Sequence, residues 1–248
     1  MSSTRLAAAL LAAAALPLAP ASAAQPYLAL AAGGMRAASA DTLAQQAQDK
    51  LVRAAYRTAE KDQALALLDD ALATAERALR AEPASERAQL QKGLALGYRA
   101  KLTRSQSDAR EAREILRGLV TDNPRSALGW AALGGWHGEA VTNMGSFLAR
   151  AMVGAKTDSA MESFRRAYRL DPDDPVIRTM YAINAIGLKE EDSAAEIRAL
   201  LAPVAAGSGG GALAEIMRAN ARTLLGVIDD PDALRRNAYD MRPFDRFV

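Results

Sequence analysis

The feature that most constrains the fold is a repeated helical pattern, in which apolar residues recur every three or four positions and turns with proline or glycine separate the segments. This spacing places the apolar residues on one face of an α-helix, which is then buried against a neighbour. Alanine, the commonest residue at 58 of 248, has the highest helix propensity. We therefore expect an all-α protein.

The helices are expected to end at turns such as Asn123-Pro124, Asp171–Asp174 and Gly207–Gly211. Proline pushes the residue before it out of the α region, so a helix stops there. Asp41 is expected to cap the first helix. The expected helices span 41–59, 62–81, 85–101, 107–121, 125–137, 157–170, 175–188, 191–202, 212–228 and 231–239.

The N-terminal residues have the layout of a secretory signal peptide at 1–23. Arg5 supplies one positive charge, an apolar run extends from Leu6 to Leu16, and small residues follow two prolines. The run is too short to span a bilayer, which needs about 20 residues. A mitochondrial presequence is the alternative. We expect an exported, periplasmic chain with no transmembrane segment after cleavage.

The rest of the chain divides by composition. Residues 24–40 are rich in Ala, Gly and Ser without a periodic apolar face, which predicts a flexible lead-in. The helical domain is expected over 41–240. Residues 241–248 form a tail with two phenylalanines that either docks back on the body or presents a peptide to another protein.

Composition excludes several classes of function. Lys and Arg total 31 against 29 Asp and Glu, a net charge of +2, so no nucleic-acid partner is expected. Cysteine is absent and His137 is the single histidine, which rules out thiolate zinc sites and Cys/His nucleophile pairs. No phosphate-binding or nucleophile-elbow motif occurs. We therefore expect a protein that is not an enzyme and has no catalytic residues, metal or cofactor.

Aligning the chain on three prolines exposes an internal repeat. Small or apolar residues stand at the same three offsets before each proline. Downstream of Pro124 the next helix reads Trp130-x-x-Leu133-Gly134-x-x-His137, and Gly93 holds the place of Gly134 downstream of Pro83. The three sets are Ala160, Phe164 and Ala167 before Pro172, Ala112, Leu116 and Leu119 before Pro124, and Ala71, Ala75 and Ala78 before Pro83.

These residues resemble the tetratricopeptide repeat, whose pattern is W-x₂-L-G-x₂-Y, then A-x₃-F-x₂-A, then P, with His137 here in the tyrosine place. The prolines are 41 and 48 residues apart rather than the family's 34, so the chain looks like an exported bacterial member with expanded, degenerate repeats. The resemblance implies antiparallel helical hairpins stacked into a right-handed superhelix.

The best repeat carries extra length between His137 and Ala160. Apolar residues recur there at helical spacing, among them Val141, Leu148 and Met152, so an inserted helix is expected. Three interpretations are open: a filler of the core, a mobile lid or a membrane-facing strip. Its own charges, Glu139 and Arg150, are too few for a basic membrane-surface helix. His137 is most simply a buried histidine with one hydrogen-bonded nitrogen.

The resemblance also implies a concave surface that binds extended peptides or helices. The function expected from it is an exported scaffold that binds a protein or peptide in envelope assembly or secretion. The alternative is a carrier of an apolar small molecule or lipid, gated by the inserted helix. The positions expected in the groove are Arg87, Leu90, Leu94, Tyr98, Leu128, Glu139, Val176, Thr179 and Ile183.

Overall fold

The computed structural model describes residues 38–188 and 194–247. Within these ranges the chain forms eleven α-helices and a 3-10 turn, with no strand. The all-α prediction is therefore confirmed. The predicted signal peptide 1–23 and nearly all of the predicted lead-in 24–40 lie outside the described residues.

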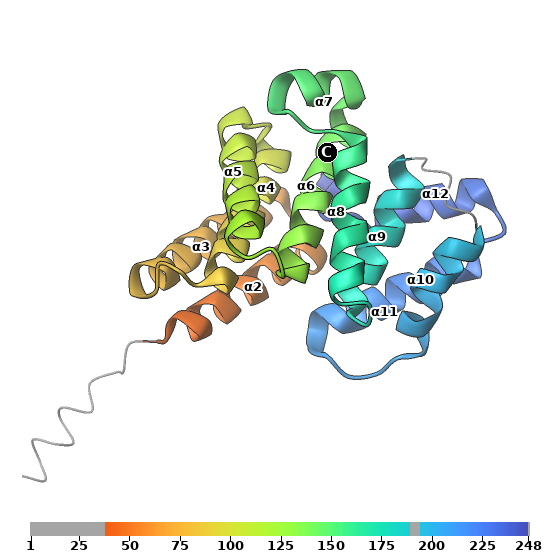
Figure 1. The fold of residues 1–248 in the computed structure, drawn as a ribbon, viewed down its shortest axis with the longest axis horizontal. Helices are drawn as coiled ribbons and strands as arrows, with labels where there is room; N and C mark the ends of the chain where they lie inside the picture. Colours follow the sequence, from red (N-terminus) through yellow and green to blue (C-terminus); the bar gives the residue numbers. More distant parts are fainter. Residues whose placement is uncertain (1–37, 189–193, 248) are drawn as a thin grey trace, which may run out of the picture. The chain divides into compact units, whose positions relative to one another are not determined.

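The helices pack mainly against their neighbours in the chain (Figure 1). The closest pairs are α2 with α3, α4 with α5, and α6 with α8, while α7 is the inserted helix. Helix α9 contacts α6, α8, α10, α11 and α12. The bounds are α2 (Ala40–Tyr56), α3 (Lys61–Ala81), α4 (Glu86–Thr103), α5 (Gln106–Asp122), α6 (Ala127–Met144), α7 (Ser146–Val153), α8 (Thr157–Leu170), α9 (Pro175–Leu188), α10 (Ala194–Ala206), α11 (Gly211–Gly226), α12 (Pro231–Asp240) and the 3-10 turn η1 (Asp245–Phe247).

Each of the three repeat prolines is followed, two positions later, by the residue that caps the next helix. Ser85 Oγ accepts from the Ala88 N–H at 3.4 Å, and Ser126 Oγ accepts from the Gly129 N–H at 3.1 Å. Asp174 Oδ1 accepts two such bonds at the start of α9. The side chains satisfy N–H groups that have no partner inside the helix, which fixes where α4, α6 and α9 begin.

The first helix begins earlier than expected. Ser39 Oγ accepts from the Thr42 N–H, so Ser39 is the cap, and Asp41 lies in the first turn of α2. The prediction that Asp41 caps this helix is therefore wrong, although an acid in the first turn still interacts favourably with the helix dipole.

The repeat found in the sequence corresponds to a repeated contact in space. A Cβ on Gly93 would lie 2.8 Å from the Leu116 side chain, and a Cβ on Gly134 would lie 3.0 Å from both the Ala160 carbonyl and the Phe164 ring. Leu116 and Phe164 occupy the same offset before their prolines. Glycine thus stands in both of these units at the point where the first helix approaches the second.

Most of the predicted packing residues of the best repeat are buried: Leu133, Gly134, His137, Ala160, Phe164 and Ala167. Trp130 is half-buried. Its indole donates to the Pro124 carbonyl at 3.1 Å, and the Arg166 guanidinium lies 4.5 Å from its ring centroid. Pro172 is exposed in the turn before α9.

Two helices extend beyond their expected ends. Helix α6 continues past His137 to Met144 before Gly145, at φ 77°, separates it from α7. Helix α10 continues through Pro203, which has no N–H to give to the Ala199 carbonyl. The buried Arg178 of α9 donates to that carbonyl at 2.7 Å and to Leu200 O at 2.8 Å. Because Arg178 supplies the missing donor, the proline does not end α10.

Candidate functional site

A large groove lies among the helices that the structure describes. Its volume is about 1080 Å³. Most of its lining residues come from α2, α4, α6, α9 and α11, which are alternate helices once the inserted α7 is set aside. The others include residues of α5, α7, α12 and the segment after α12. Apolar side chains make up most of the wall, including Leu51, Val52, Leu94, Ala131, Met180, Leu213 and Met217.

Six of the nine residues expected in the groove line it: Leu90, Leu94, Tyr98, Leu128, Glu139 and Val176. The other three do not. Arg87 is exposed near the start of α4, outside the lining. Thr179 and Ile183 are completely buried, and the structure places them in the core rather than on a surface. The reason is that α9 is packed by five other helices, so a face that would be open in a regular stack is covered.

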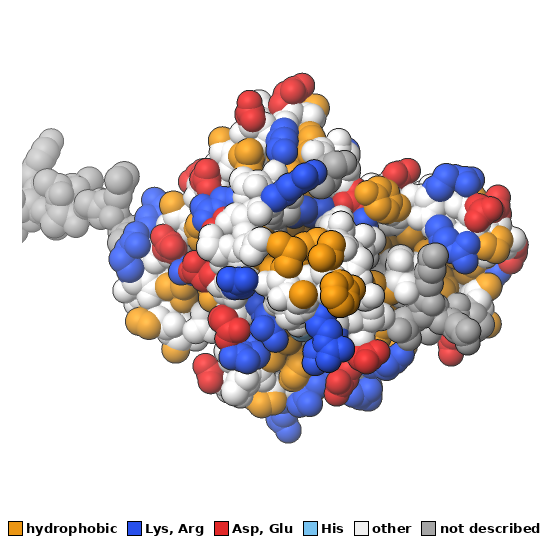
Figure 2. Space-filling view, turned by 90° about the horizontal axis from the view of Figure 1, so that it is seen from above, with side chains coloured by type: hydrophobic (Ala, Val, Ile, Leu, Met, Phe, Trp, Pro, Cys, Tyr) orange, Lys and Arg blue, Asp and Glu red, His pale blue; other side chains and the backbone are white. Residues whose placement is uncertain are grey.

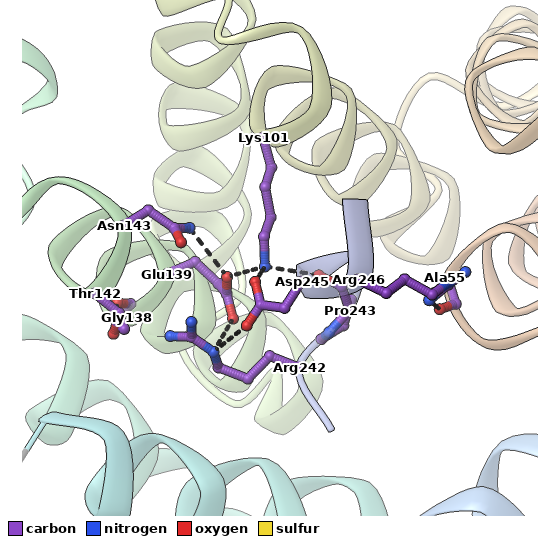
Figure 3. A network of polar contacts seen from close by, with 10 residues as sticks. All are labelled: Ala55, Lys101, Gly138, Glu139, Thr142, Asn143, Arg242, Pro243, Asp245 and Arg246. Atoms are coloured by element: carbon purple, nitrogen blue, oxygen red, sulfur yellow. Dashed lines mark hydrogen bonds and ion pairs between the residues drawn. The ribbon is translucent and has the colours of Figure 1, made fainter. Parts of the chain in front are cut away.

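Residues 241–247, which we call the C-terminal strap, pack back against α2, α4 and α6 (Figure 3). Lys101 of α4 is at the centre of this contact. Its Nζ lies 2.5 Å from Glu139 Oε2 and 2.5 Å from Asp245 Oδ1, and it donates to the Pro243 carbonyl at 2.7 Å. The ammonium thus donates hydrogen bonds to Glu139 and Pro243 and forms an ion pair with Asp245. Lys101 is therefore engaged by both the strap and α6.

Arg242 completes the charge cluster. Its Nε donates to Asp245 Oδ2 at 2.6 Å and lies 3.8 Å from Glu139 Oε1. The cluster thus holds two cations and two carboxylates, and the side chains of Arg242 and Asp245 are almost completely buried. Burying charges is costly unless each is paired, so the formal neutrality of the cluster is what permits its burial.

Two further strap residues anchor it to the first helices. Phe244 is completely buried, and its ring centroid is 5.1 Å from that of Tyr98. The Arg246 guanidinium donates to the carbonyls of Ala54, Ala55 and Thr58 at the C-terminal end of α2. Those carbonyls have no partner within the helix, and a cation also interacts favourably with that end of the helix dipole. The strap therefore docks on the body, which is one of the two alternatives that the sequence left open.

The two tyrosines beside the strap are held in the neutral form. Burial raises the pKa of Tyr98, and the negative charge of Glu139 raises it further. Burial, followed by Tyr98 and Glu139, also raises the pKa of Tyr56. At neutral pH both rings are therefore uncharged parts of the groove wall.

Gln91 is a groove residue that the sequence pattern did not single out. It lines the groove, is only 3% exposed, and its Oε1 has no hydrogen-bond partner. A buried amide oxygen without a partner is unusual and costs free energy. No sequence signal distinguishes Gln91, because a lone glutamine on a helix is ordinarily exposed.

His137 of α6 is buried and does not line the groove. Its Nδ1 accepts from the Lys156 N–H at 3.3 Å, just before α8. Burial, together with the positive charges of Arg113 and Lys156, lowers its pKa to about 4. The contacts of Glu139 are with Lys101, Arg242 and Asn143. Within the described ranges, no three His, Asp or Glu side chains are grouped so that they could hold a metal ion.

No family model matches this chain, and no curated protein matches it either. Among the helices that the structure describes, none combines the length and apolar character needed to cross a bilayer.

Proposed function

We propose that the chain is a non-enzymatic, exported scaffold of the tetratricopeptide-repeat type that binds a segment of a partner protein in its groove. The observation that carries this proposal is that most of the groove lining comes from alternate helices of the stack. Such a surface presents side chains from successive repeats along one path, which suits an extended peptide or a helix. For an exported scaffold, we propose a role in envelope assembly or secretion.

The chemistry of the wall supports a peptide more than a charged ligand. The wall is mostly apolar, and Lys101 and Glu139 are already engaged with each other and with the strap. Gln91 lines this apolar surface, and its buried Oε1 has no hydrogen-bond partner. A backbone N–H is the donor that every non-proline residue of a bound segment carries. The expected partner segment is therefore apolar, with its main chain running past Gln91.

The test is affinity capture of the chain, expressed with its own N-terminal residues in a Gram-negative host, cross-linked in the periplasm and read by mass spectrometry for proteins and lipids. Two variants address the groove. Leu128→Glu places a charge on an exposed lining residue, so folding is unaffected. Gln91→Leu removes the unpaired amide, so stability is unchanged or higher while capture falls.

Leu170→Glu is the matched control, because Leu170 is similarly exposed but does not line the groove. One reproducible protein partner, kept by Leu170→Glu and lost by both groove variants, supports the proposal. Equal capture by the groove variants would place the binding surface elsewhere. Recovery of the chain only from the cytoplasm would refute the export part.

The alternative function is a carrier of an apolar small molecule or lipid. The observation in its favour is that Met152 and Val153 of α7 also line the groove, so movement of α7 would change access to it. Native mass spectrometry of the purified chain separates the two proposals. A stoichiometric apolar ligand without a protein partner favours the carrier, and an empty chain that captures a protein favours the scaffold.

A further inference from the structure

Helix α7 presents the most exposed large apolar side chain among the described residues. Phe147 is 81% exposed and its neighbour Leu148 is 50% exposed, whereas Ala149 and Val153 face inward and are buried. Figure 2 looks down on the end of the molecule where α7 lies, and hydrophobic side chains gather there with Lys and Arg side chains on several sides. One face of α7 therefore packs against the body, and the other face exposes Phe147 and Leu148 to the surroundings.

The surroundings of α7 are positively charged. Residues 140–157 contain no Asp or Glu and carry Arg150 and Lys156, both exposed, and one exposed acid, Asp158, follows in the first turn of α8. Helix α5 adds two more cations: Arg110 donates to the Met152 carbonyl at 2.9 Å, and the Arg113 guanidinium packs beside Gly154.

The acidic side chains of α5 pair mainly with cations that do not adjoin α7, although Glu114 also contacts Arg113. Glu111 pairs with Lys92 at 3.2 Å, and Glu114 pairs with Arg117 at 2.5 Å and with Arg113 at 3.8 Å. The two charges that the sequence assigns to the inserted helix, Glu139 and Arg150, therefore understate the positive charge around Phe147.

The size of the patch argues against a second copy of the chain as its occupant. A stable protein interface buries about 800 Å² on each partner, whereas this patch consists of two large side chains on an eight-residue helix. A lipid surface needs less area, because a few apolar side chains inserted at the headgroup level act together with cations that attract anionic lipids. Helix α7 has both features.

We propose that α7 is a peripheral membrane contact, which inserts Phe147 and Leu148 into the interface of an anionic lipid surface while Arg110, Arg150 and Lys156 contact the headgroups. The helix is already formed and is bounded by Gly145 at φ 77° and Gly154 at φ 73°, so binding needs no ordering of this segment. This role is independent of what the groove binds.

The experiment is co-sedimentation of the full chain with phosphatidylcholine vesicles that contain or lack phosphatidylglycerol. The N-terminal residues are the same in every variant, so their contribution cancels in the comparison. The expected result is preferential binding to the anionic vesicles that weakens as salt is raised. The double variant Phe147→Ser with Leu148→Ser is expected to reduce this binding by about tenfold or more, and Arg150→Glu with Lys156→Glu is expected to reduce it as well.

Leu170→Ser is the control, because it removes an exposed leucine that is not part of α7. This variant should bind the anionic vesicles as strongly as the unaltered chain does. Unchanged thermal unfolding of all variants shows that the fold is intact. The proposal is overturned if the double variant binds anionic vesicles as well as the unaltered chain, or if the unaltered chain shows no preference for them. It is also overturned if sedimentation velocity shows a dimer that the double variant loses, because the patch then binds a second copy.

Discussion

At the scale of single residues, His137 shows how burial sets the behaviour of a titratable group. The position is one at which the repeat pattern carries a tyrosine, and the imidazole occupies it as a neutral, buried ring that stands edge-on to Trp136. Its Nδ1 accepts the Lys156 N–H, which ties α6 to the segment between α7 and α8. Protonation of Nδ1 would remove that acceptor and add a charge beside Arg113 and Lys156.

We predict that His137 makes the fold sensitive to acid. Its folded-state pKa of about 4 lies below the usual 6.5, so the unfolded chain binds the proton first as the pH falls. The stability that depends on the neutral ring is full above about pH 6.5 and is lost between there and pH 4, by at most about 3 kcal/mol. Urea unfolding of the unaltered chain and of His137→Asn, which keeps an acceptor near Nδ1 but does not titrate, measures this loss.

The free energies of unfolding of the two proteins should diverge as the pH falls from 6.5 to 4. Carboxylates also titrate near the lower limit, but they do so in both proteins and cancel in the difference. A difference that stays constant with pH, or an NMR titration of His137 centred near pH 6.5, would contradict the assignment.

At the scale of helices, the close approach of α6 to α8 depends on a glycine. Gly134 faces the backbone of Ala160 and the ring of Phe164, and neither can move freely because both residues are completely buried. By contrast, Gly118 of α5 has no atom within 4 Å of where its Cβ would be. The two positions therefore separate a glycine that packing requires from one that it does not.

Gly134→Ala is expected to destabilise the chain by about 1–3 kcal/mol, because α6 and α8 must move apart. Gly118→Ala is expected to stabilise it by up to about 1 kcal/mol, because alanine has the higher helix propensity. Chemical denaturation of the two variants measures both effects. If both substitutions change stability in the same direction, the close contact of α6 with α8 is not what selects glycine at position 134.

Local sequence rules predicted the helices well because their signals are local. The prolines and the apolar spacing predict most of the helices to within a few residues, whereas α6 continues beyond its expected end at 137 to Met144. The continuation of α10 through Pro203 could not be predicted in this way, because the compensating donor, Arg178, belongs to another helix. The burial of Thr179 and Ile183 likewise depends on how many helices surround α9.

The candidate site was predictable only where it follows the repeat. Leu90, Leu94, Leu128 and Val176 fall on the groove because their helical register puts them there. Glu139 also lies in the groove wall, but its engagement by Lys101 and Arg242 depends on a contact between distant parts of the chain. Periodic patterns do not predict such a contact. The two phenylalanines of the tail were the only sequence feature that suggested that the tail could dock on the body.

At the scale of the whole described region, the C-terminal strap makes the first helices depend on the last residues. Repeat stacks are ordinarily held by contacts between neighbouring units, so their ends unfold independently. Here Phe244 packs on Tyr98, and Arg246 binds the end of α2. Loosening the strap should therefore weaken α2 as well as the strap itself.

Phe244→Ala is expected to cost about 3–5 kcal/mol, because it empties a completely buried site. Hydrogen exchange should also become faster in the last turn of α2, around Ala54, although the substitution is distant in sequence. Phe147→Ala is the control, since that ring is 81% exposed and its removal should change stability by less than about 0.5 kcal/mol. Normal protection of α2 in a folded Phe244→Ala variant would show that the strap does not stabilise it.

The strap also sets an order of events during synthesis. Arg246 reaches the Ala54 carbonyl across 192 positions of sequence, so α2 and α4 are made long before their last partner. Until residues 241–247 emerge, Lys101 and Glu139 face each other without Asp245 and Arg242, and the ring of Tyr98 lacks the cover of Phe244. A chain that ends before residue 241 would therefore leave Tyr98 uncovered and Lys101 and Glu139 without their strap partners. A chaperone or a protease could recognise an incomplete product at this exposed site.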